Sequence, residues 1–302
     1  MDARYKTLPR SRRYRFQFTT EQATRLPRYP GSAWRGLLGH GLRRVACVTR
    51  QADCGGCPVT TSCVYYRVFE TRDAGDTANA RPHPFVLDIQ PGPREPARIL
   101  ELGLTLFEPA HDAFPFLLHG LAHAGRLGIG RERTPFVLER ARRETTPGSG
   151  HWRDIDEPDG EDAPLPVPPA PSSVTIILQT PLRMKQRGRL IGAREFESAH
   201  FLRQLWRRAN ELHGPYRNGI DVPLPELKAD QVETLDRQLR WHDWKRYSSR
   251  QRTTMNMGGL VGRWTLRHER LAEWWPMIWH GQWLHLGKAT SMGLGRYRVE
   301  SP

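Results

Sequence analysis

Residues 283–299 read WLHLGKATSMGLGRYRV, which combines an apolar start, a loop with three glycines and a strand-like end. Gly287, Gly293 and Gly295 allow the backbone to approach another group closely, and the lysine and arginines beside them indicate that this group is anionic. We expect one strand before the loop, from Trp283, and another after it. In phosphate-binding loops of the P-loop or dinucleotide type the glycines lead into a helix, so this loop predicts an anion-binding site in a different fold.

A similar pattern lies near the middle of the sequence. A helix-like run at 114–123 is followed by GRLGIGR at 125–131 and by strand-like residues 136–139. In the second half, a helix-like run at 271–279 precedes GLGR at 293–296. Both stretches read helix, Gly-aliphatic-Gly-Arg, strand, so we interpret the two halves as distant copies of one folding unit.

The spacing of apolar residues elsewhere predicts the remaining helices and strands of each copy. Further strands are predicted at 13–18, 85–89, 100–107, 174–179 and 260–266, and further helices at 31–47, 195–212 and 232–239. Each half then places helices against an antiparallel sheet. The predicted fold class is therefore α+β, with two tandem ferredoxin-like domains.

The domain boundaries follow from composition. A chain of 302 residues is long enough for two domains. Residues 146–172 combine acidic side chains with many prolines, so we expect an exposed linker between an N-terminal domain, 1–145, and a C-terminal domain, 173–302. No apolar run reaches the length of a membrane helix, and residues 1–6 lack the hydrophobic region of a signal peptide. We expect a cytoplasmic protein with no membrane partner.

The charge balance predicts an anionic partner. The chain has 46 Lys and Arg against 32 Asp and Glu, which gives a formal net charge of +14 and a pI of about 10.3. Such an excess is typical of proteins that bind nucleic acids. Arginine outnumbers lysine heavily, which suits bidentate contacts to phosphate and stacking on bases. The alternative is a positive surface that only keeps the protein in solution.

The four cysteines form one cluster, Cys47-x6-Cys54-x2-Cys57-x5-Cys63. Four cysteines this close together in a cytosolic chain favour a metal site over disulfides. The spacing resembles that of the [4Fe–4S] loop of helix-hairpin-helix DNA glycosylases. A [4Fe–4S] cluster, a structural zinc ion and unligated thiols all remain open. A metal here would be structural, because four protein ligands leave no open position, and it would hold an insertion after the first helix.

Three stretches of the chain resemble segments of one known family. They are residues 284–298 (LHLGKATSMGLGRYR), 246–262 (RYSSRQRTTMNMGGLVG) and 30–44 (PGSAWRGLLGHGLRR). They resemble, in that order, the C-terminal glycine-rich loop, the segment before the last helix and the first helix of the RAMP-superfamily CRISPR endoribonucleases that cut precursor crRNA. The resemblance implies two ferredoxin-like domains, RNA cleavage without a metal, and retention of the product within or beside a CRISPR effector complex. CRISPR repeat RNA, crRNA and other Cas proteins are the implied partners.

The chemistry implied by this family places demands on the side chains. The ribose 2′-OH of the RNA attacks the adjacent phosphate, so the protein must accept a proton, protonate the leaving 5′-oxygen and stabilise the charge on the phosphorane. The candidates are His40 for proton transfer, Tyr29 for assistance and Arg43 for the phosphorane charge. For each there is a plainer interpretation: a solvated histidine, a packing tyrosine and an arginine that only holds RNA.

The position of His40 on the first helix supports its assignment. Trp34, Leu37, Leu38, Leu42 and Val45 form one apolar face, and His40 falls on the opposite side. Gly36 and Gly39 are expected to leave the preceding turn bare, so that a phosphate can approach.

Further side chains are predicted to bind RNA. They are Arg35, Arg44, Arg250, Arg252, Lys288, Arg296, Gly293 and Gly295. The main alternative function is a catalytically inert RAMP subunit that binds crRNA in an effector complex. An iron–sulfur DNA-repair enzyme is a second alternative, supported by the cysteine spacing alone.

Overall fold

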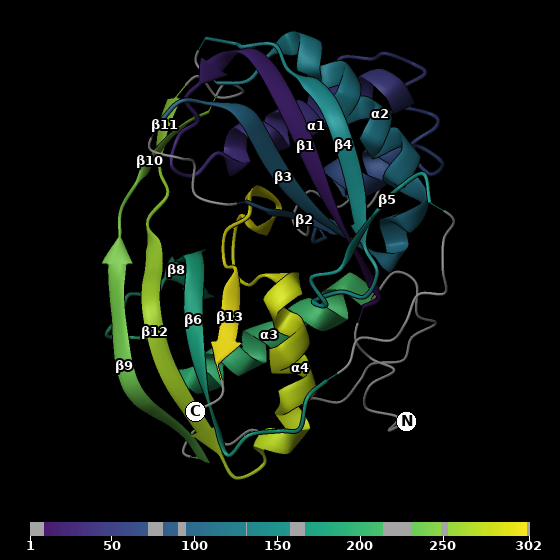
Figure 1. Cartoon of the computed structure of the whole chain (residues 1–302). Helices are drawn as coiled ribbons and strands as arrows, with labels where there is room; N and C mark the ends of the chain where they lie inside the picture. The colour runs from purple at the N-terminus through teal and green to yellow at the C-terminus, as the bar shows by residue number, and fades with distance from the viewer. Residues whose placement is uncertain are drawn as a thin grey trace. The chain divides into compact units, whose positions relative to one another are not determined.

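The computed structural model describes residues 9–71, 81–89, 95–130, 132–157, 167–213, 231–248 and 253–300, and omits the side chains of 109, 245–248, 253 and 254. The chain divides into two compact units: an N-terminal unit, Arg10–Leu165, and a C-terminal unit built on Pro166–Pro302. Figure 1 shows the first in purple to teal and the second in green to yellow. Each unit is described by itself.

The N-terminal unit has ferredoxin-like topology (Figure 1). Its elements are β1 (Ser11–Thr24), α1 (Gly31–Ala46), β2 (Phe85–Asp88), β3 (Ala97–Phe107), α2 (Phe114–Ala124), β4 (Val137–Glu144) and β5 (Trp152–Asp154). The antiparallel sheet has the order β2-β3-β1-β4-β5, so the first four strands reproduce the ferredoxin-like arrangement, in which strands 1 and 3 are central. Short turns of π-helix (η2, Tyr66–Glu70) and 3₁₀-helix (η3, Glu108–Ala113; η4, Gly125–Leu127) complete the unit.

The C-terminal unit repeats this topology. Its central elements are β6 (Ser173–Leu182), α3 (Ser198–His213), β9 (Val232–His242), β12 (Gly259–His268), α4 (Leu271–Leu284) and β13 (Tyr297–Glu300). The sheet order β13-β6-β12-β9 is the same as in the first unit. Two small hairpins, β7 (Lys185–Gln186) with β8 (Arg189–Leu190) and β10 (Lys245–Ser248) with β11 (Thr253–Asn256), and a 3₁₀ turn, η6 (Thr290–Met292), are added to it. The predicted tandem of ferredoxin-like domains is confirmed.

Two of the predicted elements are wrong. Residues 232–239, predicted as a helix, lie in β9, an edge strand without a fully buried side chain. The apolar residues there follow a helical spacing, but pairing with β12 determines the conformation. The strand predicted from Trp283 is also wrong, because α4 continues to Leu284 before the glycine-rich loop begins.

Part of the predicted linker folds with the N-terminal sheet. β5 pairs with β4, and the Arg15 guanidinium lies 4.2 Å from the centre of the Trp152 ring on β5. Residues 158–166 of the predicted linker fall outside the described residues. The boundaries at 145 and 172 stay a prediction.

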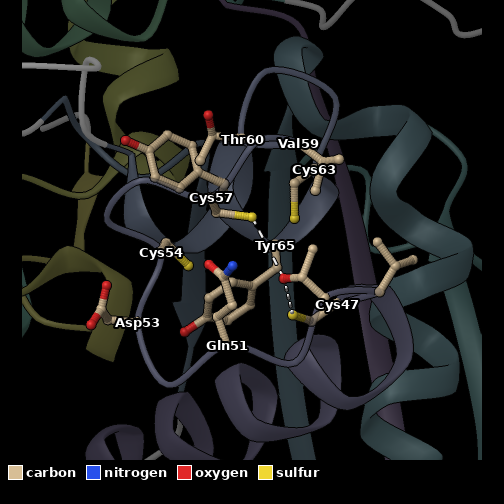
Figure 2. A pocket seen from close by; sticks show the side chains of 12 residues that line it. Cys47, Gln51, Asp53, Cys54, Cys57, Val59, Thr60, Cys63 and Tyr65 are labelled. Atoms are coloured by element: carbon tan, nitrogen blue, oxygen red, sulfur yellow. Dashed lines mark hydrogen bonds between the residues drawn. The ribbon is translucent and has the colours of Figure 1, made fainter.

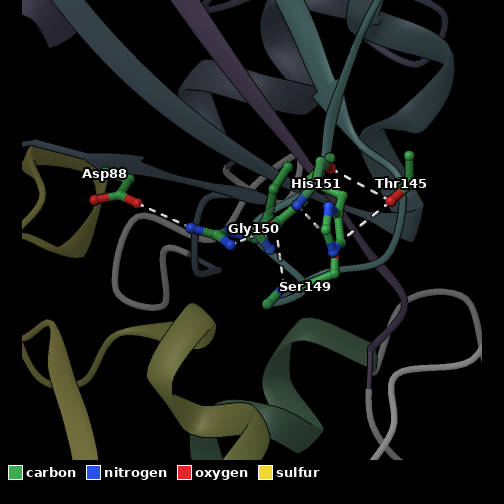
Figure 3. Close-up of polar contacts among 8 residues, drawn as sticks. Asp88, Thr145, Ser149, Gly150 and His151 are labelled. Carbon is green, nitrogen blue, oxygen red and sulfur yellow. Dashed lines mark hydrogen bonds and ion pairs between the residues drawn. The ribbon is translucent and has the colours of Figure 1, made fainter.

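A buried ionic network connects the strands of the N-terminal sheet. Arg13 lies 3.2 Å from Asp88 on β2 and also pairs with Glu144 at the end of β4. The Glu144 carboxylate accepts hydrogen bonds from the backbone N–H groups of Gly148 (2.9 Å) and Gly150 (2.8 Å). Figure 3 shows the turn that follows, with Thr145, Ser149 and His151 hydrogen-bonded to one another. The network therefore fixes β1, β2 and the end of β4 together.

The two helices of the N-terminal unit meet at a pair of glycines. A Cβ atom added to Gly41 on α1 would lie 2.0 Å from the carbonyl oxygen of Gly120 on α2. No side chain fits at this distance, so the helices pack through their backbones.

The substitution Gly41→Ala is therefore expected to lower the free energy of unfolding by about 1–3 kcal/mol, because the helices must separate to accept the methyl group. Urea denaturation measures this change. Gly36→Ala is the matched control: no atom lies within 4 Å of its added Cβ, so alanine is expected to be neutral or to stabilise the same helix. An equal loss for both variants would contradict the packing argument.

Candidate active site

Helix α1 presents one accessible strip on the N-terminal unit. Trp34, Leu38 and Leu42 are completely buried in the core. The other side of the helix carries Gly36, which has open space beside it, and the exposed side chains of His40 and Arg44. These three residues are spaced by four positions and so lie above one another on the helix surface. The predicted position of His40, opposite the apolar face, is thus confirmed.

Two details of the predicted helix surface are wrong. Val45 does not complete the apolar face, since its side chain is 40% exposed. Gly39 does not leave the surface bare, because a Cβ atom added there would lie 2.4 Å from the ring of Phe69 in η2. Phe69 therefore covers this glycine, and of the two only Gly36 leaves room for a phosphate.

Tyr29 and Arg43 have local packing contacts. The Tyr29 side chain is buried, with the Arg28 guanidinium 5.7 Å from the centre of its ring. The Arg43 guanidinium donates to the carbonyl of Ala52 (2.8 Å) and to that of Gln51, and so binds the loop after α1 to the last turn of the helix. The catalytic roles of Tyr29 and Arg43 stay predictions, and these contacts give them no support.

Arg35 also faces the protein. Its guanidinium lies 4.5 Å from the centre of the Phe69 ring, and its Nη2 lies 3.1 Å from His83 Nε2. The side chain is half-buried. Its predicted contact to RNA stays a prediction, as does that of the exposed Arg44.

The glycine-rich loop of the C-terminal unit folds onto strand β6. A Cβ atom added to Gly295 would lie 1.7 Å from the Leu286 carbonyl oxygen. The Gly295 N–H donates to Pro181 (3.0 Å) and the Gly293 N–H to Thr290 (2.8 Å). Because these amides bond within the protein, the close approach that the glycines permit is to the chain's own backbone. RNA contacts by Gly293 and Gly295 stay predictions without support from this geometry.

The charged residues of this loop differ in accessibility. Lys288 is exposed, whereas Arg296 is half-buried and its backbone N–H donates to Thr180 Oγ1 (2.9 Å). Thr180 also donates to the Gly293 carbonyl (2.8 Å), so it fixes the loop from β6, a role that the sequence alone did not indicate. Arg250 and Arg252, also predicted to bind RNA, lie outside the described residues.

The four cysteines line one small cavity in the N-terminal unit (Figure 2). All four are free thiols and are partly accessible. Within the described part of the chain, no three His, Cys, Asp or Glu side chains stand close enough together to form a ready metal site. The four cysteines thus share one cavity, and a metal centre there stays a prediction.

Across the ranges that the structure describes, no helix combines the length and the apolar character that crossing a membrane requires.

Two family models match the chain. Residues 8–164 match AF_1859_N, described as an N-terminal domain, and residues 176–297 match CRISPR-associated endoribonuclease Cas6. No curated protein matches the sequence significantly.

Solved structures with the same fold cover nearly the whole chain. A Cas6 product complex superposes with a TM-score of 0.57 at 16% identity, covering 96% of this chain and 100% of the other. Thermus thermophilus Cas6 superposes with a TM-score of 0.53 at 16% identity, covering 97% of this chain and 99% of the other. A chain of a partial Cas6-RT-Cas1–Cas2 complex superposes with a TM-score of 0.57 at 12% identity, covering 98% of this chain and 46% of the other. These structures share the fold of the chain, and the match of residues 176–297 to the Cas6 model shows that the chain belongs to the Cas6 family of CRISPR-associated endoribonucleases.

Proposed function

We propose that this protein cleaves CRISPR repeat RNA to mature crRNA by attack of a ribose 2′-OH, without a metal ion in the reaction, and then retains the product. The observation that carries the proposal is the strip of Gly36, His40 and Arg44 on α1. His40 exposes its imidazole to solvent, Arg44 places a cation one turn further on, and Gly36 leaves open space one turn before. Membership of the Cas6 family supplies the reaction class.

His40 would act as the base. A neutral imidazole nitrogen accepts the 2′-OH proton while the 2′-oxygen forms a bond to phosphorus. The bond from phosphorus to the 5′-oxygen breaks, and that oxygen receives a proton from water or from an acid in the site. The products are a 2′,3′-cyclic phosphate and a free 5′-OH, so atoms and charge balance with no further reactant.

The neighbouring groups would position the phosphate. Arg44, one turn after His40, can hold a phosphate oxygen and offset charge on the phosphorane. Gly36 lets the RNA backbone come close to the helix. Tyr29 and Arg43 act on RNA in this scheme only if their present contacts rearrange.

Retention of the product is proposed from the overall charge. A net charge of +14 favours a slow release of crRNA, because each phosphate contact adds to the electrostatic affinity. One structurally similar chain comes from a partial Cas6-RT-Cas1–Cas2 complex. Other Cas proteins are accordingly the partners that we propose for this chain.

The test is cleavage of a repeat RNA from the CRISPR array of the source genome, in excess EDTA and in magnesium. We expect equal rates in both, a cyclic phosphate detected by mass spectrometry of the 5′ fragment, and co-elution of one product with the protein. Tight binding with no cleavage under either condition would contradict the nuclease and leave the inert RAMP subunit.

The exposed Lys288 gives a separate prediction for RNA affinity. Lys288→Gln is expected to weaken binding of repeat RNA several-fold and to reduce the slope of log K against log salt by about 0.7–0.9, because one phosphate contact is lost. Filter binding at several salt concentrations measures both. Arg207→Gln removes the same charge from an exposed side chain that is already paired with Glu211 (2.6 Å). If this control weakened binding equally, Lys288 would act through net charge and not through contact.

A further inference from the structure

The segment from Cys47 to Cys63 lacks the usual means of holding a loop in place. It follows α1 directly, contains no helix or strand, and every one of its residues is described. None of its side chains is fully buried, and Val48 is 78% exposed. Loops of this length without secondary structure or a core of their own are uncommon in compact domains. Burial of its own side chains contributes little to holding this one, so other interactions must contribute.

The interior of the segment is lined by thiols. Cys47, Cys54, Cys57 and Cys63 surround a cavity of about 10 Å³, and Figure 2 shows their sulfur atoms directed toward it. Thr49 Oγ1 lies between two of them, 3.5 Å from Cys57 Sγ and 3.9 Å from Cys47 Sγ. Chain segments far apart within the loop therefore bring their sulfur atoms to one place.

The turn between Cys54 and Cys57 has the geometry of a metal-binding turn. The Cys57 N–H donates to the Cys54 carbonyl (3.3 Å), and Gly56 has φ = 71°, a value that favours glycine. The Gly55 N–H donates to Asp53 Oδ1 (2.8 Å), which fixes the start of the turn. A Cys-x2-Cys turn of this kind places two thiolates on the same side for one ion.

The loop is fixed to the N-terminal unit at several points. Cys54 in its middle and Cys63 at its end pack against the hydrophobic core. Arg43 binds the carbonyls of Gln51 and Ala52 to the last turn of α1. The outer frame of the loop is thus set by the protein, and the four thiols share the lining of its cavity with Thr49, Asp53 and Tyr65 among others.

We propose that the four cysteines bind one structural metal centre, and that its occupant is a zinc ion. The cavity has room for about one water-sized sphere, so a single ion requires less movement of the loop than a cluster does. Rotation of the cysteine side chains must shorten the sulfur–metal distances to about 2.3 Å. All four ligand positions belong to the protein, so the centre binds no substrate. It holds the loop against the end of the helix that carries His40.

The experiment needs no RNA, so its failure is separate from a failure of the proposed nuclease. The full chain is purified without oxygen from cells supplied with zinc and iron, and its metal and acid-labile sulfide are measured. We expect about one zinc per chain, lost in Cys54→Ser/Cys57→Ser and kept in Ser62→Ala, a control in the same loop. Replacement by Co²⁺ is expected to give the absorption bands of tetrahedral thiolate coordination. Trypsin is expected to cut at the exposed Arg50 only after the metal is removed.

Each other result has a defined meaning. About four iron and four sulfide per chain would keep the four-thiolate centre and overturn zinc as its occupant. Four free thiols in a soluble protein without stoichiometric metal would overturn the centre, as would disulfides between the cysteines.

Discussion

Replacing His40 with alanine is expected to slow cleavage of repeat RNA by about 10²–10⁴-fold under single-turnover conditions. The reason is that the substrate hydroxyl loses the group that accepts its proton. His40 is exposed and lies on the side of α1 opposite the core, so its removal leaves no cavity and the fold is expected to persist. RNA affinity is expected to change by less than about threefold, because the lysines and arginines that bind phosphate stay in place.

His119→Ala is the matched control for this prediction. His119 is also exposed and also lies on a helix of the N-terminal unit, α2. Its replacement is expected to leave the cleavage rate unchanged. Gel assays of cleavage and filter binding separate the two effects. A His40→Ala protein that cleaves at the rate of the unaltered chain would remove His40 from the mechanism, and equal slowing in both variants would indicate a general effect on the fold.

Replacing Arg13 with methionine is expected to lower the free energy of unfolding by about 3–5 kcal/mol. Arg13 compensates Glu144, whose side chain is 2% exposed, and Asp88, whose side chain is 14% exposed. Methionine fills a similar volume but removes the guanidinium that pairs with both carboxylates. Glu144 also accepts hydrogen bonds from the backbone N–H groups of Gly148 and Gly150, so the turn after β4 depends on the same carboxylate.

Arg15→Met is the control for Arg13, since it removes an arginine two residues further along β1. Its guanidinium stacks over Trp152 at 4.2 Å, and its loss is expected to cost about 1 kcal/mol or less. Urea denaturation of both variants decides the matter. The Arg13 guanidinium also lies over the Trp152 ring, 5.7 Å from its centre. If the two variants were equally destabilised, the effect of Arg13 would come from this contact and not from the buried ion pairs.

The sequence predicted most of the fold because most elements carry a clear local period. In α1 the apolar residues Trp34, Leu38 and Leu42 recur at helical spacing and are all buried. In β1, Tyr14, Phe16 and Phe18 alternate with polar residues and are all buried. β9 was misread because its conformation is determined by pairing with β12, a partner that no local window contains.

The site was less predictable because several of its contacts come from residues distant in sequence. The exposed position of His40 follows from helix geometry alone. The cover that Phe69 places over Gly39, and the contact of Arg43 with the loop at Gln51, depend on how η2 and the cysteine loop pack. The glycine-rich loop shows the same limit: its glycines indicated a close approach, but only the fold shows that the group approached is the chain's own backbone.

The measurement that tests the central claim most directly is cleavage of a repeat RNA that carries a single 2′-deoxy sugar on the 5′ side of the mapped cut site. It is run in excess EDTA beside the unmodified RNA, with the affinity of the protein for each RNA measured in parallel. We predict that both RNAs bind with the same affinity, that the unmodified RNA is cut in EDTA, and that the deoxy RNA is not cut. Cutting of the deoxy RNA at a comparable rate would contradict attack by the 2′-OH and with it the mechanism assigned to His40.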